Sequence, residues 1–267
     1  MIMESLELKK FLKDVGNSVH SMNTIAVALS LLPNENVTTP KGLEISWNPK
    51  DLQYSKMMSR NYSERSSYVY AAESLFEYLD NISKNAFWNY PEHNFKGEEK
   101  KAIKVYRFLK ATPGITDSMA ILCELLSHWR NRIVHLSISN AELSSNKKEI
   151  LKNEKDDIYS NFHHFDILIA LENFDNKKIT LKDVSTLITI AIKCARLVDD
   201  YYFYGISKKD TETLYTEFLR DIHFKKIINQ SESKKKERQI ERWLSVNYPY
   251  LTVEKSKEIL GKIKTSP

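Results

Sequence analysis

Three polar residues in one short segment, Arg130, Asn131 and His135, carry the side chains that chemistry on a phosphodiester requires. An imidazole transfers protons near neutral pH, so His135 can act as a general acid or base. The planar guanidinium of Arg130 can hold phosphate oxygens and stabilise the charge that develops in the transition state. The Asn131 amide can orient the imidazole or a phosphate oxygen. The segment therefore predicts a site that acts on a phosphate ester.

The residues around this segment predict one helix over about 117–138, with Thr116 and Asp117 as its cap. On an ideal helix, Arg130 and His135 lie about 140° apart. The two side chains can therefore converge on one phosphate only if they bend together or if a second subunit completes the site. The opposite arc of the helix is apolar and predicts its core face: Leu122, Leu125, Leu126, Trp129, Ile133 and Leu136.

Two further residues share the polar arc of this helix. Glu124 lies four residues before His128, so the two side chains can meet on one face. A carboxylate there would favour the charged form of the imidazole. They are interpreted either as support for the site or as a helix-surface ion pair.

The pattern Arg130-Asn131-x-x-x-His135 resembles the motif of the HEPN superfamily of helical nucleases. That motif is an Arg, often followed directly by Asn, with His about four to six residues further on. The superfamily is a helical bundle with the motif on one of its later core helices, and the placement here is similar.

The resemblance implies metal-independent cleavage of RNA by attack of the 2′-hydroxyl, which leaves 2′,3′-cyclic phosphate and 5′-hydroxyl ends. His135 would be the acid or base, Arg130 the phosphate clamp and Asn131 an orienting residue. The resemblance also implies a homodimer in which two motif helices meet, and a role as a toxin or antiviral defence effector under the control of an antitoxin or another regulatory partner.

An acidic residue from an earlier helix often lies near the motif in HEPN folds. Glu73, Glu77 and Asp80 lie on the long helix that is predicted over 51–84. Glu73 is taken as the supporting residue, although no spacing rule separates it from the other two, and solvated helix-surface charges are the alternative.

Several other basic residues are weaker candidates for RNA contacts. Arg132 falls at the edge of the polar arc, where a solvated charge is the favoured interpretation. A basic run near the end of the chain could bind an RNA backbone, although glutamates interrupt it and favour a solvated helix. The residues of this run are Lys234, Lys235, Lys236 and Arg238.

The composition predicts an all-α protein. Only 6 Gly and 7 Pro punctuate 267 residues, so long helices are favoured over strands. The predicted architecture is a HEPN-like helical bundle over 1–205 and a basic helical C-terminal extension over 206–267. All of the net charge of +5 lies in that extension, since 1–205 holds 26 basic and 26 acidic residues. Further helices are predicted at 3–32, 99–111, 160–173, 181–204, 210–228, 232–246 and 250–264, and 139–160 is predicted to be a solvated connector that is partly helical or mobile.

Cys123 and Cys194 lie in apolar helical stretches and are predicted to be buried thiols. We expect neither a metal site nor a cofactor, because adjacent His163 and His164 point about 100° apart on a helix with no third ligand near. Motifs of nucleotide hydrolases and acyl hydrolases are missing. With no leader and no apolar run of membrane-spanning length, we expect a cytoplasmic protein without a membrane partner.

Two other functions remain open at this stage. The chain could be a non-catalytic HEPN-like module that dimerises or binds RNA. It could also be a helical protein-interaction partner in which the motif has no role.

Overall fold

The computed structural model describes residues 4–33, 37–84, 95, 99–135, 142–207, 209–248 and 251–265. Within these ranges every regular element is an α-helix and no strand is present, which confirms the predicted all-α class. None of the described helices is long and apolar enough to cross a membrane. The helices are α1 Leu6–Leu31, α2 Leu52–Ser83, α3 Lys101–Lys110, α4 Asp117–Val134, α5 Ser145–Asn153, α6 Lys155–Asn161, α7 Ile167–Asp175, α8 Leu181–Ser207, α9 Thr211–Phe218, α10 Ile222–Ile228, α11 Ser233–Asn247 and α12 Val253–Thr265.

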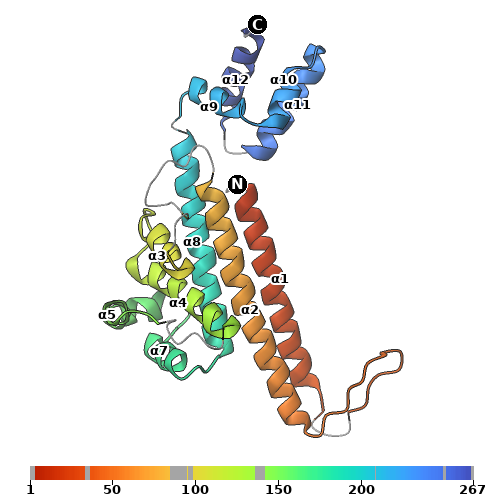
Figure 1. Ribbon diagram of the computed structural model, residues 1–267, viewed down its shortest axis with the longest axis vertical. Helices are drawn as coiled ribbons and strands as arrows, with labels where there is room; N and C mark the ends of the chain where they lie inside the picture. The colour runs from red at the N-terminus through yellow and green to blue at the C-terminus, as the bar shows by residue number, and fades with distance from the viewer. Residues whose placement is uncertain are drawn as a thin grey trace.

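Helix α2 is the central helix of the bundle, because α1, α4 and α8 all pack against it (Figure 1). Ala71, Leu75 and Leu79 recur at helical spacing and are fully buried. Burial of each of the larger side chains contributes roughly 1.5–3 kcal/mol relative to exposure. The helix begins where the Asp51 carboxylate accepts a hydrogen bond from the backbone N–H of Tyr54.

Helix α8 completes the bundle, as its apolar sequence predicts. Leu187, Ile190 and Ala191 are buried against the other helices. Cys194 of α8 lies with its Sγ 3.7 Å from that of Cys123 in α4, and both cysteines are free and buried, as predicted. The contact with Cys194, together with burial, raises the pKa of the Cys123 thiol well above its ordinary value.

Helices α1 and α2 continue as a pair beyond the other helices (Figure 1). The last buried residue of α1 is Met22, and the first of α2 is Ser63. The part of the pair beyond these residues carries Val27, Leu31 and Met57 on its surface. The hydrophobic core is therefore concentrated in the half of the pair that α4 and α8 contact.

The described part of the predicted connector, 142–160, is largely helical. Where the structure describes it, α5 and α6 occupy most of its length, with Leu151 and Ile158 buried. The Ser144 hydroxyl accepts from the backbone N–H of Lys147 and caps α5. Apolar residues are sparse among the charged ones here, so the composition left open whether the segment is helical, and tertiary packing stabilises two helices in it.

The prediction of one helix over 160–173 is wrong for the residues before α7. His163 and His164 have φ of 52° and 58°, a left-handed conformation that a right-handed helix cannot include. The chain therefore turns between α6 and α7. Asp166 restarts the helix, because its carboxylate accepts the backbone N–H groups of Leu168 and Ile169.

Helices α9, α10 and α11 share a cluster of aromatic rings. The Trp243 ring of α11 lies 5.3 Å from that of Phe218 in α9 and 4.7 Å from that of Phe224 in α10, between ring centroids. The single helix predicted over 210–228 is divided into α9 and α10, because Asp221 caps the second of them. Figure 1 places these helices at the end of the bundle where α8 ends.

A buried carboxylate, Asp199 on α8, ties the start of α1 to the bundle. Its Oδ2 accepts the backbone N–H of Ser5 at 2.9 Å, and the Ser5 hydroxyl donates to Oδ1. The Tyr78 hydroxyl of α2 lies 3.3 Å from the same Oδ1. Burial outweighs these hydrogen bonds and raises the pKa of Asp199 to about 6.

We predict that Asp199 makes the fold less stable as the pH rises from about 4 to about 6. The folded state binds the Asp199 proton more tightly than the unfolded chain, so stabilisation is present at low pH and lost as the carboxyl ionises in the folded state. At about 1.4 kcal/mol per pKa unit, the upper limit of this loss is about 3 kcal/mol.

Urea unfolding between pH 4 and 7.5 tests this prediction. Asp199→Asn should remove that part of the pH dependence, whereas Asp200→Asn, at an exposed neighbour on the same helix, should follow the original chain. Identical pH profiles for Asp199→Asn and the original chain would contradict the assignment.

Candidate active site

Stacked aromatic rings orient helix α4 within the bundle. The Trp129 ring is stacked on Tyr68 of α2 at 5.4 Å and meets the Phe174 ring of α7 edge-on at 5.1 Å. Trp129 is almost fully buried, so the turn of α4 that follows it has a defined rotation. Arg130 is thereby directed toward α2, and Arg132 toward α7.

Helix α4 ends earlier than the predicted helix over about 117–138. Its start is as expected, since the Thr116 hydroxyl accepts from the backbone N–H of Met119. Its last helical residue is Val134, and His135 is the C-cap with φ −117° and ψ 81°. Residues 136–138 of the predicted helix lie outside the described residues.

This helix end brings Arg130 and His135 together. The Nη1 of Arg130 lies 3.2 Å from Nε2 of His135, and it also donates to Oδ1 of Asn131 at 3.1 Å. The ideal helix of the sequence analysis separated Arg130 and His135 by about 140° because it treated His135 as helical. The non-helical backbone at His135 removes that separation, so the two side chains meet within one chain.

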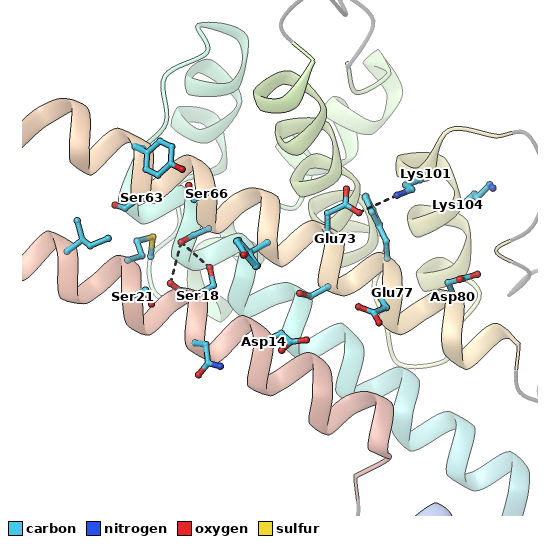
Figure 2. Close-up of a pocket in the computed structure, with 18 of the residues that line it drawn as sticks. Asp14, Ser18, Ser21, Ser63, Ser66, Glu73, Glu77, Asp80, Lys101 and Lys104 are labelled. Atoms are coloured by element: carbon cyan, nitrogen blue, oxygen red, sulfur yellow. Dashed lines mark hydrogen bonds and ion pairs between the residues drawn. The ribbon is translucent and has the colours of Figure 1, made fainter. Parts of the chain in front are cut away.

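Glu73 of α2 joins Arg130, Asn131 and His135 in one group of polar side chains, the active-site cluster. Its Oε1 forms an ion pair with Nη2 of Arg130 at 2.5 Å, and its Oε2 lies 3.3 Å from Nζ of Lys101 on α3. Figure 2 shows Glu73 and Lys101 pointing toward each other from α2 and α3. Of the three acidic residues considered on α2, Glu73 is the one that contacts the motif. Lys101 was not predicted, because no local pattern links α3 to the motif.

The cluster is open to solvent at its His135 end. His135 is exposed, whereas the Arg130 side chain is 17% exposed and the Glu73 side chain 38%. The Nε of Arg130 is buried and makes no hydrogen bond with any described residue. The guanidinium is thus held at its tip by Glu73, Asn131 and His135, at the surface that an approaching ligand would meet.

Glu124 and His128 are buried, so their interpretation as a helix-surface ion pair is wrong, whereas a supporting role in the site stays a prediction. Nε2 of His128 lies 3.5 Å from Oε1 of Glu124, with both side chains at most 5% exposed. Lys147 of α5 forms an ion pair with Oε2 of Glu124 at 2.5 Å. Because Lys147 and Tyr106 of α3 cover this arc, the pair is neither a surface ion pair nor accessible to a substrate at the Arg130 end.

Arg132 was predicted to be a solvated charge because it falls at the edge of the polar arc of an ideal helix. In the structure it contacts α7 instead. Its guanidinium lies over the Phe174 ring at 3.5 Å and donates to the Phe174 carbonyl. Burial lowers the pKa of this guanidinium. Arg132 therefore connects the end of α4 to α7, and an RNA contact by Arg132 stays a prediction.

The basic residues of α11 lie with the C-terminal helices. Lys234, Lys235 and Arg238 are exposed, whereas Nζ of Lys236 donates to the carbonyl of Ile228 at the end of α10. An RNA contact by the exposed three stays a prediction.

No three His, Cys, Asp or Glu side chains of the described ranges are grouped as a metal site. No protein-family model matches the chain, and neither the curated proteins nor the solved structures include a significant match to it.

We predict that Arg132→Ala destabilises the fold by about 1–3 kcal/mol, through loss of a cation–π contact and a charged hydrogen bond. Thermal and urea unfolding measure this loss. Arg196→Ala, at an exposed arginine of α8, is the matched control and should unfold like the original chain. Unchanged stability of Arg132→Ala with weakened RNA binding would instead support a phosphate contact.

Proposed function

We propose that this chain is a metal-independent endoribonuclease of the HEPN type. The observation that carries the proposal is the 3.2 Å contact between Nη1 of Arg130 and Nε2 of His135 at the surface of a helical bundle. A group that moves protons and a group that binds phosphate oxygens thus adjoin one exposed position. Asn131 and Glu73 hold the guanidinium from two sides.

In the proposed mechanism Nε2 of His135, the nitrogen beside Arg130, takes the proton. A guanidinium only donates hydrogen bonds, so Nε2 is the acceptor in this arrangement and the neutral imidazole carries its proton on Nδ1. When a phosphodiester binds, its anionic oxygens compete for the Arg130 donors. Nε2 is then released toward the ribose, and it can accept the proton of the 2′-hydroxyl.

The reaction is an internal transesterification. The 2′-oxygen loses its proton to His135 and forms a bond to phosphorus, while the bond from phosphorus to the 5′-oxygen breaks. The leaving 5′-oxygen takes a proton and becomes a 5′-hydroxyl, and the other product is a 2′,3′-cyclic phosphate. Arg130 stabilises the extra charge on the phosphate oxygens. DNA is not a substrate in this scheme because it lacks the 2′-hydroxyl.

A homodimer would supply the second proton-transfer group. The attacking and leaving oxygens lie on opposite sides of phosphorus, so one imidazole cannot easily serve both in a single step. A second His135 from a partner subunit would act as the acid, and a second Arg130 would share the charge. We propose this arrangement in a cytoplasmic toxin or defence effector whose activity is controlled by a regulatory partner.

We predict that the original chain cleaves RNA in the presence of EDTA and that Arg130→Ala and His135→Ala each reduce the rate at least about 100-fold. Purified protein is incubated with total RNA, and the products are tested for cyclic phosphate and 5′-hydroxyl ends. His20→Ala, at an exposed histidine of α1, and Arg196→Ala are the matched controls and should cleave normally.

Cleavage that survives in both active-site variants would rule out the proposed site. RNA binding without cleavage under any activating condition would favour the non-catalytic RNA-binding module. Neither binding nor cleavage would favour the protein-interaction partner.

We predict further that the specific activity falls on dilution, because each site requires two subunits. Sedimentation at the same protein concentrations should show a dimer dissociating as the activity is lost. A fully active monomer would contradict the dimeric site while leaving the roles of Arg130 and His135 intact.

A further inference from the structure

A large cleft runs along α1 and α2 beside the proposed active site. Its volume is about 1000 Å³, at the upper end of the range for small-molecule sites. α1 and α2 contribute most of its lining, and α3 contributes Lys101 and Lys104 at one end. Figure 2 shows the labelled residues of α1, α2 and α3 that line this cleft.

One end of the cleft is rich in hydroxyl groups and aromatic rings. Ser18, Ser21 and Ser66 line it together with Tyr62, and Tyr70 lies on α2 between this end and Glu73. The tyrosines are 75% and 63% exposed, and within the described ranges neither ring stacks on another. Such surface rings present faces on which a planar ligand can stack, while the serines offer hydrogen bonds to its edge.

The other end is charged but largely neutralised. Its acidic residues are Asp14, Glu73, Glu77 and Asp80, and the last three are each paired with a cation: Arg130 and Lys101 with Glu73, Lys10 with Glu77 and Lys84 with Asp80. Lys101 also lies over the Phe76 ring at 4.9 Å. An anionic ligand that displaced Glu73 would therefore find two cations already in place, Arg130 and Lys101.

Glu73 lines the cleft and is ion-paired with Arg130, so the cleft adjoins the active-site cluster. The helical rise places Ser66 about 10 Å along α2 from Glu73. By the same rise Tyr70 lies about 4.5 Å and Tyr62 about 16 Å from Glu73 along α2, so bases stacked on the two rings would follow a path that begins at a phosphate on Arg130. This spacing suits a phosphate and the base of a nearby nucleotide on one strand.

We propose that the cleft binds unpaired bases of single-stranded RNA next to the phosphate that Arg130 and His135 cleave. This inference rests on the proposed ribonuclease function and names its substrate class. Bases stack on Tyr62 and Tyr70, and their edges bond to the serine hydroxyls. Bases of a duplex are paired and stacked inside the helix, so duplex RNA is excluded.

Binding is tested in a His135→Ala background, which prevents cleavage, with a fluorescent 12-nucleotide RNA of mixed sequence. We expect Tyr62→Ala and Tyr70→Ala each to weaken binding about tenfold, and Tyr62→Phe and Tyr70→Phe to retain affinity because the ring remains. Tyr54→Ala, at an exposed tyrosine of α2 outside the cleft, is the matched control. An unlabelled duplex of the same sequence should not compete. Thermal unfolding verifies that the variants are folded.

The inference is overturned if Tyr62→Ala and Tyr70→Ala bind the RNA as tightly as the control variant Tyr54→Ala does. It is also overturned if the duplex competes effectively. Cleavage by chains that retain His135 separates the two proposals. If the original chain cleaves RNA and the Tyr62→Ala, Tyr70→Ala double variant has the same kcat/KM, the cleft inference fails and the ribonuclease function stands. If the original chain neither cleaves nor binds RNA, both fail.

Discussion

The stack of Tyr68 on Trp129, continued edge-on by Phe174, sets the geometry at the end of α4. Aromatic pairs contribute about 0.5–1.5 kcal/mol beyond the burial of their surface. Their larger effect here is directional, because α4 cannot rotate without breaking contacts to α2 and α7 at once. The residues on either side of this ring layer have different surroundings as a result. Arg130 meets the carboxylate of Glu73, whereas Arg132 lies against Phe174.

The Glu73–Arg130 ion pair is a product of this packing and contributes little to the stability of the fold. Partly exposed ion pairs contribute about 0–1 kcal/mol, far less than the apolar surface that α2 and α4 bury together. The pair matters for chemistry because it keeps a guanidinium extended beside His135. A phosphate oxygen can replace a carboxylate oxygen there at little cost, since both are anionic acceptors of the same donors.

The ionisable residues along α4 and its C-cap differ in exposure to solvent. Glu124 and His128 are enclosed with Lys147, whereas His135 is in solvent. A buried carboxylate needs a cation nearby, and α5 supplies it. The enclosed group thus fastens α5 to the bundle, and only the last turn of α4 and its cap are left for a ligand.

Local patterns along the chain were enough to predict the all-α class, the approximate extents of α1, α2 and α8 and the burial of both cysteines, and to indicate the resemblance of the Arg130-Asn131-x-x-x-His135 segment to a nuclease motif. These depend on local propensity and on the period of apolar residues, which are written along the chain. Tertiary structure decided which polar residues are accessible, because the wheel of one helix does not include its neighbours. It enclosed Glu124 and His128, turned Arg132 onto Phe174 and selected Glu73 with Lys101 from other helices. It also ended α4 at Val134, and the contact of Arg130 with His135 follows from that one departure from helical backbone.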